Sequence, residues 1–431
     1  MNKGLQRIRT LLDADTFMEL DGANEEGLPA GTGKINGHTV CVYAHNPEIS
    51  AGAMSEGMIS RICTLLDTSV RMGVPFIELN ESAGARIQNG VGALAGLGEV
   101  FRRQIAASGT IPQIAVCFGS CAGGAVYSSS LADFTIMIRN SSYMYLTGPS
   151  VVRAATGEDT DHESLGGADI HGRKSGVAHF IADSEEEALK LARDILGYLW
   201  EKESTSEASL PETDMKDIVG LIPNNPSRPY DMHDVITVIA DRNSILEVHN
   251  EWASNIICSF ARIGGHAVGI VANQPKVLAG SLDGKASMKA ARFIGQCDRF
   301  RLPVITLVDV PGFLCGSICE HEGIITQGTA LLREYAKATI PKITVTLRKS
   351  YGGAHIAMCC KQLGGGVALA WPDATLAVMG KAGAGKVIHD TDGQKKFESA
   401  EHALKHGYID EIVVPEDTRS RIIDILASVD K

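Results

Sequence analysis

The chain has 431 residues, 44% hydrophobic and 21% charged, a balance that is ordinary for a globular protein of two or three domains. Its net charge of −11 argues against nucleic acid as the main partner, because binding to a phosphate backbone needs basic patches. No window reaches the roughly 20 apolar residues of a membrane-spanning helix, and the first residues lack the apolar core of a signal peptide, so we expect a cytoplasmic protein.

The first half of the chain alternates predicted strands and helices. In chain order the pattern predicts a strand over 39–44, a helix over 53–73, a strand over 75–79, a helix through Arg102 and Ile105, a strand over 113–118, a helix opened by Gly123 and Gly124, and a strand over 134–138. This alternation predicts a mostly parallel sheet covered by helices.

A segment rich in Ser, Pro, Asn and acidic residues, 201–229, predicts a linker. After it the order repeats, with a strand over 268–271, a helix over 286–300, a strand over 304–308, a loop over 309–316, a helix over 328–339, a strand over 343–347 and a closing helix over 419–429. We therefore divide the chain into an N-terminal domain, 1–212, and a C-terminal domain, 213–431.

The two halves share landmarks that recur about 228 residues apart, a period of domain size. Ile111-Pro112 leads to the pair Gly123-Gly124, and Ile340-Pro341 leads to the pair Gly352-Gly353 at the same distance. Upstream, three further short stretches keep the same offset, beginning at Thr16 and Ser244, at Lys34 and Arg262, and at Asn46 and Asn273. The chain is a duplication, and we expect two similar half-sites.

A glycine pair between a strand and a helix brings a ligand close to bare backbone and aims amide donors at negative charge. Each pair has a second glycine loop upstream, Ala83-Gly84-Ala85 in one half and Pro311-Gly312-Phe313 in the other. Two converging loops predict a pair of donors that stabilises an oxyanion, although close helix–strand packing would explain a single glycine pair.

These loops resemble the crotonase superfold, whose members stabilise enolates of acyl-CoA thioesters, and the tandem arrangement resembles the carboxyltransferase (β) subunit of biotin-dependent acyl-CoA carboxylases. The matching stretches include Ser82-Ala83-Gly84-Ala85-Arg86, Ala122-Gly123-Gly124, Leu146-Thr147-Gly148-Pro149, Lys174-Ser175-Gly176, Val308-Asp309-Val310-Pro311-Gly312-Phe313 and Lys349-Ser350-Tyr351-Gly352-Gly353-Ala354. The resemblance covers nearly the whole chain and implies an α/β fold of two tandem crotonase-like β-β-α domains.

The resemblance implies that carboxybiotin gives up CO2, that its freed ureido group takes the α-proton of a short-chain acyl-CoA such as acetyl- or propionyl-CoA, and that the enolate captures the CO2. It places Gly123 and Gly124 at the thioester, and Gly353 and Ala354 at the ureido oxygen of biotin. Further substrate-binding residues would be Ala83, Gly84, Ala85, Arg86, Lys174, Gly312, Phe313 and Ile356.

The family resemblance also implies partners. No Met-Lys-Met motif in a suitable context is present to carry biotin. A separate biotin carboxyl carrier protein and a biotin carboxylase subunit would therefore complete the reaction. In the family the half-sites come from different subunits, so we expect a homo-oligomer, a hexamer, with no metal in this chain.

Four features depart from the family pattern. The segment before Arg7 and the segment between Gly380 and Gly407 are short, and His355-Ile356 replaces a Tyr-Asp pair seen in many propionyl-type members. Ile356 therefore resembles the acetyl-type or broader-chain choice, with an apolar pocket floor. Cys315 and Cys319 also differ from the usual loop, without a physical explanation from the sequence.

Other signals have ordinary interpretations. The stretch over 380–387 approaches a phosphate-binding P-loop but ends in Val387 where Ser or Thr must reach Mg2+. Cys315, Cys319 and His321 form half a zinc site with no second pair. His355 is expected in the pocket wall more than as a general base. Lys174 suits either CoA phosphates or solvent, and Arg86 suits either ligand or loop bracing.

Three alternative functions can be weighed against the residues, and the residues disfavour the second and third of them. A carboxyltransferase subunit of a decarboxylase acting on methylmalonyl-CoA or glutaconyl-CoA would use the same sites in reverse. A hydratase or isomerase would need a carboxylate just after the glycine pair, where Ala125, Val126 and Tyr127 stand. A non-catalytic scaffold would carry bulky residues at the glycines, and none is present.

Overall fold

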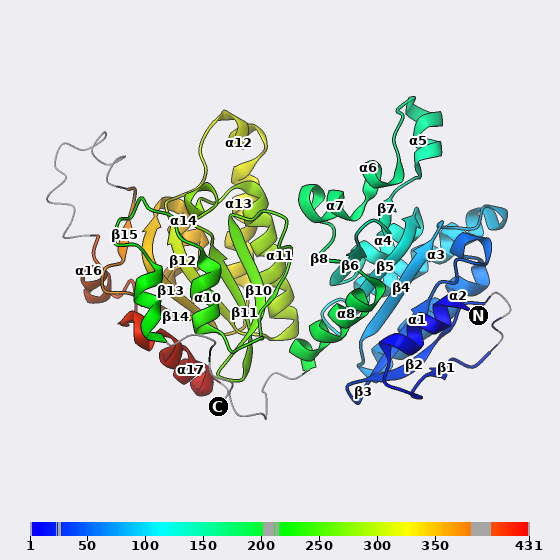
Figure 1. Ribbon diagram of the computed structural model, residues 1–431, viewed down its shortest axis with the longest axis horizontal. Coiled ribbons are helices and arrows are strands. Elements are labelled where there is room, and N and C mark those ends of the chain that lie inside the picture. Colours follow the sequence, from blue (N-terminus) through cyan, green and yellow to red (C-terminus); the bar gives the residue numbers. More distant parts are fainter. Residues whose placement is uncertain are drawn as a thin grey trace. The chain divides into compact units, whose positions relative to one another are not determined.

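The computed structural model describes residues 2–22, 24, 27–200, 211, 215–380 and 398–429. Contacts divide the chain into two compact units, Met1–Leu199 and Trp200–Lys431 (Figure 1). Each unit carries one 8-stranded sheet with helices packed against it. The predicted domain boundary at 212 lies outside the described residues.

The N-terminal unit is built around the strand order β1-β2-β3-β4-β5-β6-β8, with β7 pairing β5. The strands β1 to β3 are antiparallel and the rest pair in parallel. Its strands are β1 (Met18–Glu19), β2 (Ala30–Ile35), β3 (His38–Ala44), β4 (Phe76–Ser82), β5 (Gln113–Ala122), β6 (Phe134–Ile138), β7 (Tyr143–Tyr145) and β8 (Phe180–Ala182). Its helices are α1 (Lys3–Leu11), α2 (Glu56–Met72), α3 (Gly90–Ala107), α4 (Gly124–Leu131), α5 (Pro149–Thr156), α6 (His162–Gly166), α7 (Ala168–Ile170) and α8 (Glu185–Trp200).

The C-terminal unit repeats this plan in the order β16-β14-β13-β12-β11-β10-β9, with β15 pairing β13. Its strands are β9 (Leu246–Glu247), β10 (Ile256–Ile263), β11 (His266–Asn273), β12 (Val304–Val310), β13 (Lys342–Tyr351), β14 (Val367–Ala370), β15 (Thr375–Ala377) and β16 (Glu411–Ile412). Its helices are α9 (Ile218–Leu221), α10 (Met232–Ile239), α11 (Gly284–Phe300), α12 (Ser317–His321), α13 (Ile324–Lys337), α14 (Gly352–Ala357), α16 (Ala400–Lys405) and α17 (Thr418–Val429).

Helix signals in the sequence explain the long helices beside each sheet. The Ser55 side chain accepts a hydrogen bond from the Met58 N–H and caps α2, which ends at Gly73 with φ 65°. In the other unit the Asp283 side chain caps α11 in the same way through the Ala286 N–H. Both helices pack a largely apolar buried face against the strands, which makes each unit a layered α/β core.

The predicted strands and helices largely coincide with observed elements, although the sequence pattern gives no helix for α1, α8 or α10 and two further regions differ. The predicted linker over 201–229 is wrong in its second part, because α9 and the residues around it pack on the C-terminal core. Ile218 is fully buried there, and Ile222 and Tyr230 are nearly so. The sequence does not predict the antiparallel outer strands or the helices α5 to α7, because these elements are short or have no clear hydrophobic periodicity.

Candidate active site

The first glycine pair lies where the buried strand β5 turns into α4. Gly123 has φ 57°, a conformation that L side chains rarely adopt, and its N–H donates to the carbonyls of Tyr145 and Leu146 at 3.3 and 3.2 Å. Gly124 begins the helix, so its N–H has no carbonyl of an earlier turn to bond. The Gly124 N–H is therefore the donor that this turn offers to a ligand.

The loop after β4 supplies the second donor of this half. Met54 N–H donates to Gly84 O at 2.8 Å, Arg86 N–H donates to Met54 O at 2.8 Å, and Gly84 N–H donates to Ser82 Oγ at 3.1 Å. Within the described part of the chain, this leaves the Ala85 N–H without a hydrogen-bond partner.

The two loops of this half lie directly against each other. A Cβ added to Gly84 would be 2.8 Å from Ala122 O, and one added to Gly123 would be 3.9 Å from Gly84 Cα. The predicted convergence of Ala83-Gly84-Ala85 on the glycine pair is therefore what the structure has, and it forms a two-donor arrangement suited to an oxyanion.

The second half repeats the arrangement around β12 and β13. Leu282 N–H donates to Gly312 O at 3.1 Å and Leu314 N–H donates to Leu282 O at 2.7 Å, which mirrors the bonds around Met54. Phe313 thus corresponds to Ala85, and its N–H has no hydrogen-bond partner among the described residues. A Cβ on Gly353 would lie 3.8 Å from the Phe313 ring, so these two loops also meet.

This correspondence shifts the second donor by one residue from the expected place. Gly353 corresponds to Gly124, whereas Ala354 corresponds to Ala125 inside the helix. Ala354 is fully buried and Gly353 is exposed. The geometry therefore favours the Gly353 N–H, with the Phe313 N–H, as the donors of the second half-site.

Three other predicted site residues are not part of the donor arrangement at either pair of glycine loops. Arg86 is half-buried beside its loop, and Ile356 is 45% exposed just after the second glycine pair. Lys174 is exposed on the turn His171–Ser175, and within the described residues no ion pair or hydrogen bond ties it to either glycine loop.

Two histidines weighed in the sequence have different surroundings. His355 Nδ1 lies 2.9 Å from Ser350 Oγ, and burial lowers the pKa of His355, so the neutral ring is favoured. His355 lies in α14, and its interpretation as a helix-lining or pocket-wall residue stays a prediction. His321 ends the short helix α12 and is exposed.

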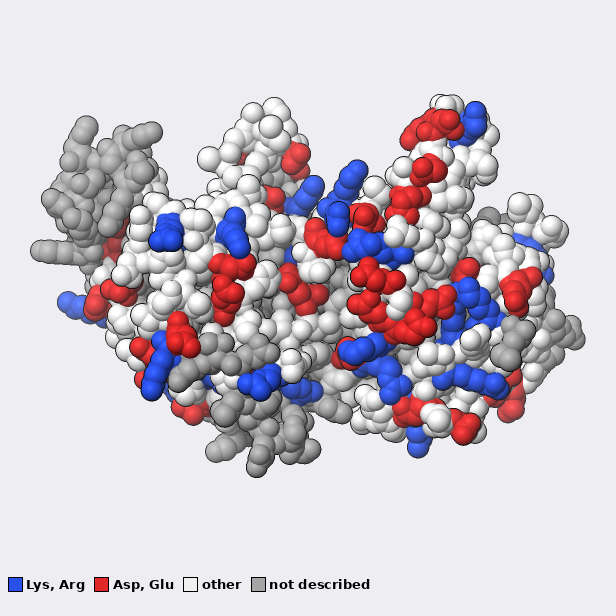
Figure 2. Space-filling model, viewed as in Figure 1, with Lys and Arg blue, Asp and Glu red and all other residues white. Residues whose placement is uncertain are grey.

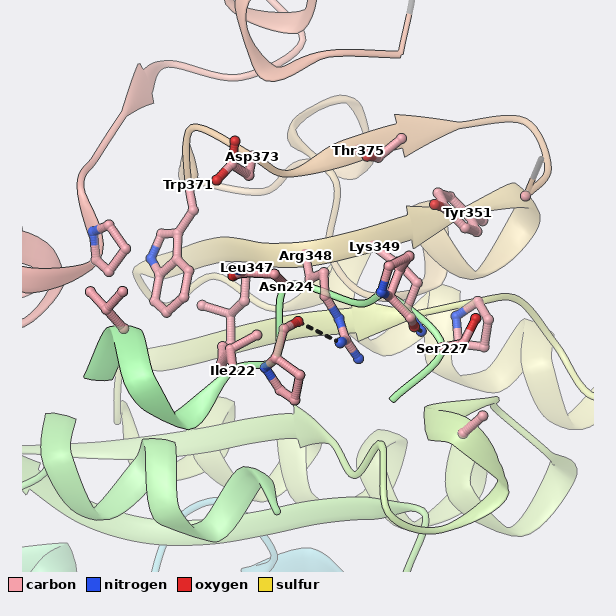
Figure 3. Close-up of a pocket in the computed structure, with 17 residues that line it drawn as sticks. Ile222, Asn224, Ser227, Leu347, Arg348, Lys349, Tyr351, Trp371, Asp373 and Thr375 are labelled. Atoms are coloured by element: carbon pink, nitrogen blue, oxygen red, sulfur yellow. Dashed lines mark hydrogen bonds between the residues drawn. The ribbon is translucent and has the colours of Figure 1, made fainter. Parts of the chain in front are cut away.

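A cavity of about 970 Å³ opens beside the second glycine pair (Figure 3). Tyr351 and Pro311, which precede the two donor loops, line the cavity, and so does Trp371. Arg348 and Lys349 form part of the wall between them. The space is large enough to hold a small organic molecule, and its wall includes the residues just before each donor loop, Pro311 and Tyr351.

Sequence reasoning missed the ionic groups that support the loops. Arg348 Nε donates to Asp309 Oδ2 at 3.0 Å, and Arg7 lies 2.6 Å from Glu81 Oε2. Within each pair the residues are far apart in sequence. Only the recurrence of an acid four residues before Ala85 and Phe313 could have indicated them.

On the face that Figure 2 shows, acidic and basic side chains are interspersed in both units.

Among the described residues, no three His, Cys, Asp or Glu side chains gather as metal ligands. The P-loop-like residues 381–387 lie outside the described residues. No described helix combines the length and apolar character needed to cross a membrane, and the cytoplasmic location stays a prediction.

Comparison with known proteins shows the family to which the chain belongs. The family described as "Carboxyl transferase domain" matches residues 5–428. The propionyl-CoA carboxylase carboxyltransferase subunit of Haloferax mediterranei is 43% identical, over 97% of this chain and 88% of that protein. The methylmalonyl-CoA decarboxylase subunit alpha of Veillonella parvula is 41% identical, over 98% of this chain and 89% of that protein.

A solved structure has the same fold over almost the whole chain. Transcarboxylase 12S, crystallised with hydrolysed methylmalonyl-coenzyme A, superposes with a TM-score of 0.92 at 37% identity, covering 99% of this chain and 88% of that one. The predicted crotonase-like α/β fold is confirmed.

Proposed function

This chain belongs to the carboxyl transferase family, and on that premise we propose which molecule each glycine pair holds. It is a carboxyltransferase of the biotin-dependent acyl-CoA carboxylases and transfers a carboxyl group to an acyl-CoA. We propose that the acceptor is a short-chain acyl-CoA, acetyl- or propionyl-CoA, and that the donors of Ala85 and Gly124 hold its thioester oxygen. The donors of Phe313 and Gly353 hold the ureido oxygen of biotin.

The chemistry at the first half-site needs charge stabilisation more than a side-chain acid or base. As the α-proton leaves the acyl group, negative charge grows on the thioester oxygen. The N–H groups of Ala85 and Gly124 are fixed by the surrounding backbone bonds, so they do not need to reorganise as that charge develops. No carboxylate follows Gly124 in α4, which agrees with a base that comes from outside the chain.

The second half-site fits the urea of biotin. When bound, biotin on a partner protein supplies the transferred carboxyl group and the base that takes the α-proton. Gly353 lacks a Cβ and has open space up to the Phe313 ring, so a planar ring system can approach its N–H. The Phe313 and Gly353 donors would orient that ring and stabilise charge on its oxygen, and the adjoining cavity gives room for it.

Partners follow from the same premise. We propose that biotin is brought by a biotin carboxyl carrier protein and loaded by a biotin carboxylase subunit. We also propose a homo-oligomer, with a hexamer as the expected form, since the structurally similar transcarboxylase 12S is described as a hexamer assembly.

A second candidate is carboxyl transfer in the reverse direction, within a decarboxylase. The relative from Veillonella parvula is named as a methylmalonyl-CoA decarboxylase subunit, and it is about as similar as the carboxylase subunits. The same two donor pairs serve both directions, because both pass through the same enolate.

The purified chain can be tested for carboxyl transfer between free biotin and a panel of acyl-CoA and malonyl-type CoA thioesters. Transfer between biotin and malonyl-CoA or methylmalonyl-CoA supports the proposal, and the preferred thioester gives the substrate. Transfer with none of the thioesters contradicts it. The carboxylase is distinguished from the decarboxylase by the partner that copurifies with the chain, because an ATP-dependent biotin carboxylase indicates carboxylation and a membrane decarboxylase subunit indicates the reverse direction.

A further inference from the structure

Each half of the chain carries an acidic residue at an irregularity in the strand that leads to its donor loop. The register of β4 with β5 shifts between Asn80 and Ser82, and that of β12 with β13 shifts between Val308 and Val310. The residues at the shifts are Glu81 and Asp309. Each stands four residues before the residue whose N–H is a proposed donor.

The Asp309 carboxylate joins the two strands that carry the donors of the C-terminal unit. It lies on β12, is fully buried, and accepts hydrogen bonds from Arg348 of β13, whose Nε and Nη2 are 3.0 and 2.9 Å from Oδ2. Lys349 Nζ is 3.8 Å from the other oxygen. A two-donor bond of this kind fixes direction as well as distance.

Arg348 is itself held from the other side. Its Nη1 donates to the carbonyls of Pro223, Asn225 and Arg228 at 3.1 to 3.2 Å, and Figure 3 shows the bond to Pro223. Its guanidinium also lies over the Tyr230 ring, 5.0 Å from the centroid. These contacts from several directions hold the guanidinium in one position.

The N-terminal unit makes the equivalent connection with an arginine from another element. Arg7 of α1 lies 2.6 Å from Glu81 Oε2 and 4.0 Å above the Phe118 ring of β5, and it also binds Glu185. The position that Arg348 holds in β13 is Gly119 in β5. A Cβ there would be 2.5 Å from Glu81 Oε1, so the glycine makes room for the carboxylate to lie across the strand.

The same function is thus performed twice by unrelated contacts. In both units an acid on the first donor strand is tied by an arginine to the second donor strand, directly through Arg348 or through Arg7 on Phe118. We propose that Glu81 and Asp309 are positioning residues, which set the separation of the two donors in the acyl-CoA half-site and in the biotin half-site respectively. This inference rests on the proposed function of the two half-sites.

The decisive experiment compares Asp309→Asn and Glu81→Gln in the full chain, assayed for carboxyl transfer from methylmalonyl-CoA to biotin. Both changes keep the side-chain shape and remove the charge. A donor moved by a fraction of an ångström stabilises the oxyanion poorly, so we expect transfer to fall by about 10- to 100-fold. Asp309→Asn should change the KM for biotin and leave the KM for methylmalonyl-CoA unchanged. Glu81→Gln should change the KM for methylmalonyl-CoA and leave the KM for biotin unchanged.

The control is Asp241→Asn, in the same unit. Asp241 also forms a buried ion pair, with Arg419, and it accepts hydrogen bonds from the Gly264 and Gly265 N–H groups at the turn between β10 and β11. That turn lies at the opposite end of β11 from the donor loops. Asp241→Asn should lower the melting temperature without changing either KM or kcat in an assay well below it.

Arg348→Lys is the second variant if Asp309→Asn does not fold. It keeps the charge and loses the two-donor geometry, so it should shift the KM for biotin in the same direction by a smaller factor.

Wild-type kinetics in the folded charge-removal variants, or an equal change of both KM values in each, would overturn the positioning role. Failure of the wild-type chain to transfer from any thioester would instead count against the proposed function.

Discussion

The two units place the same pair of backbone donors with different side chains behind them. The hydrogen bonds around Met54 and Leu282 are equivalent bond for bond, whereas the acid behind each loop meets its arginine from α1 in one unit and from β13 in the other. The backbone geometry is therefore common to both halves, and the supporting charges differ. A two-donor site thus depends on strand register, and its support can be rebuilt from any neighbouring element.

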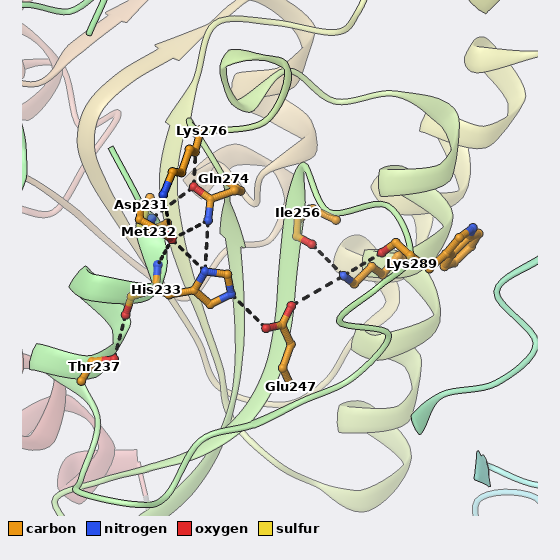
Figure 4. Close-up of polar contacts among 10 residues, drawn as sticks. Asp231, Met232, His233, Thr237, Glu247, Ile256, Gln274, Lys276 and Lys289 are labelled. Carbon is orange, nitrogen blue, oxygen red and sulfur yellow. Dashed lines mark hydrogen bonds and ion pairs between the residues drawn. The ribbon is translucent and has the colours of Figure 1, made fainter. Parts of the chain in front are cut away.

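A second pair of equivalent positions shows the same freedom. Arg61 in α2 donates to the carbonyls of Leu20 and Leu28 and pairs with Glu19. At the matching place in α11, Lys289 donates to the carbonyls of Trp252 and Ile256 and lies 4.0 Å from Glu247 (Figure 4). Both cations anchor the loop between the two outermost strands of their sheet, β1 and β2 in one unit and β9 and β10 in the other.

The largest predicted effect comes from adding a side chain at the two equivalent glycines, Gly124 and Gly353. Gly353→Val should reduce carboxyl transfer at least about 100-fold with an unchanged melting temperature, since its Cβ meets only the Phe313 ring at 3.8 Å. Gly124→Val should lose transfer and also about 1–3 kcal/mol of stability, because its Cβ would lie 2.2 Å from Leu97 Cδ1 in the core.

Transfer assays and thermal unfolding of both variants check this prediction. The predicted difference in stability is contradicted if Gly353→Val unfolds as readily as Gly124→Val. The predicted loss of activity is contradicted if either variant keeps wild-type transfer.

The next largest effect is expected when each of the two equivalent buried cations, Arg61 and Lys289, is replaced by the residue type found at the other position. Lys289 is fully buried, so Lys289→Arg adds atoms to a packed site and should lower the free energy of unfolding by about 1–3 kcal/mol. Arg61→Lys should cost less, about 0.5–1.5 kcal/mol, through the loss of one hydrogen bond. Urea titration measures both, and equal losses in the two variants would mean that the sites are interchangeable.

The third prediction concerns the pH dependence of stability, which we attribute to His233 of the C-terminal unit. The hydrogen bond to Glu247 raises the pKa of His233 to about 9, and a second hydrogen bond, to Asp231, contributes to the same shift (Figure 4). Asp231 also forms an ion pair with Lys276, at 3.3 Å. A raised pKa means that this stabilisation is complete below the unfolded value of about 6.5 and is lost as pH rises through 9.

Unfolding measured from about pH 6 to about pH 10 should therefore show a loss of stability in wild type that His233→Gln lacks. The loss should be modest, because the His233 side chain is 47% exposed. An identical pH profile in the variant would contradict the assignment.

The smallest expected effect is a change of substrate preference. Ile356 follows the second glycine pair and is 45% exposed, so Ile356→Asp should alter the polarity of the pocket without affecting folding. We expect the ratio of kcat/KM between propionyl-CoA and butyryl-CoA to change by about tenfold or less. The same ratio in both proteins would show that this position is not part of the pocket.

Much of the architecture can be predicted because local signals and the duplication agree. Strands such as 113–118 and 134–138 are largely apolar runs, and the glycine pairs recur at one spacing, so the fold and the two glycine loops can be predicted from the sequence. The tight backbone approach of Gly84 to Ala122 follows from the glycines themselves.

The rest depends on contacts that no local pattern contains. Arg7 and Glu81 are 74 residues apart in the chain, and Arg348 meets Pro223 across 125 residues. The buried role of Ile218 is hidden in a stretch of polar composition. From the sequence the second pair of donors is expected at Gly353 and Ala354, and the equivalence of Gly353 with Gly124 emerges only when the registers of β5 and β13 are compared.

Whether the two glycine pairs hold different molecules can be decided by calorimetric titration of methylmalonyl-CoA into Gly353→Val and wild type. We predict the same dissociation constant for both proteins, although the variant no longer transfers the carboxyl group to biotin. Loss of methylmalonyl-CoA binding in Gly353→Val would contradict the assignment, because the CoA thioester would then occupy the second pair.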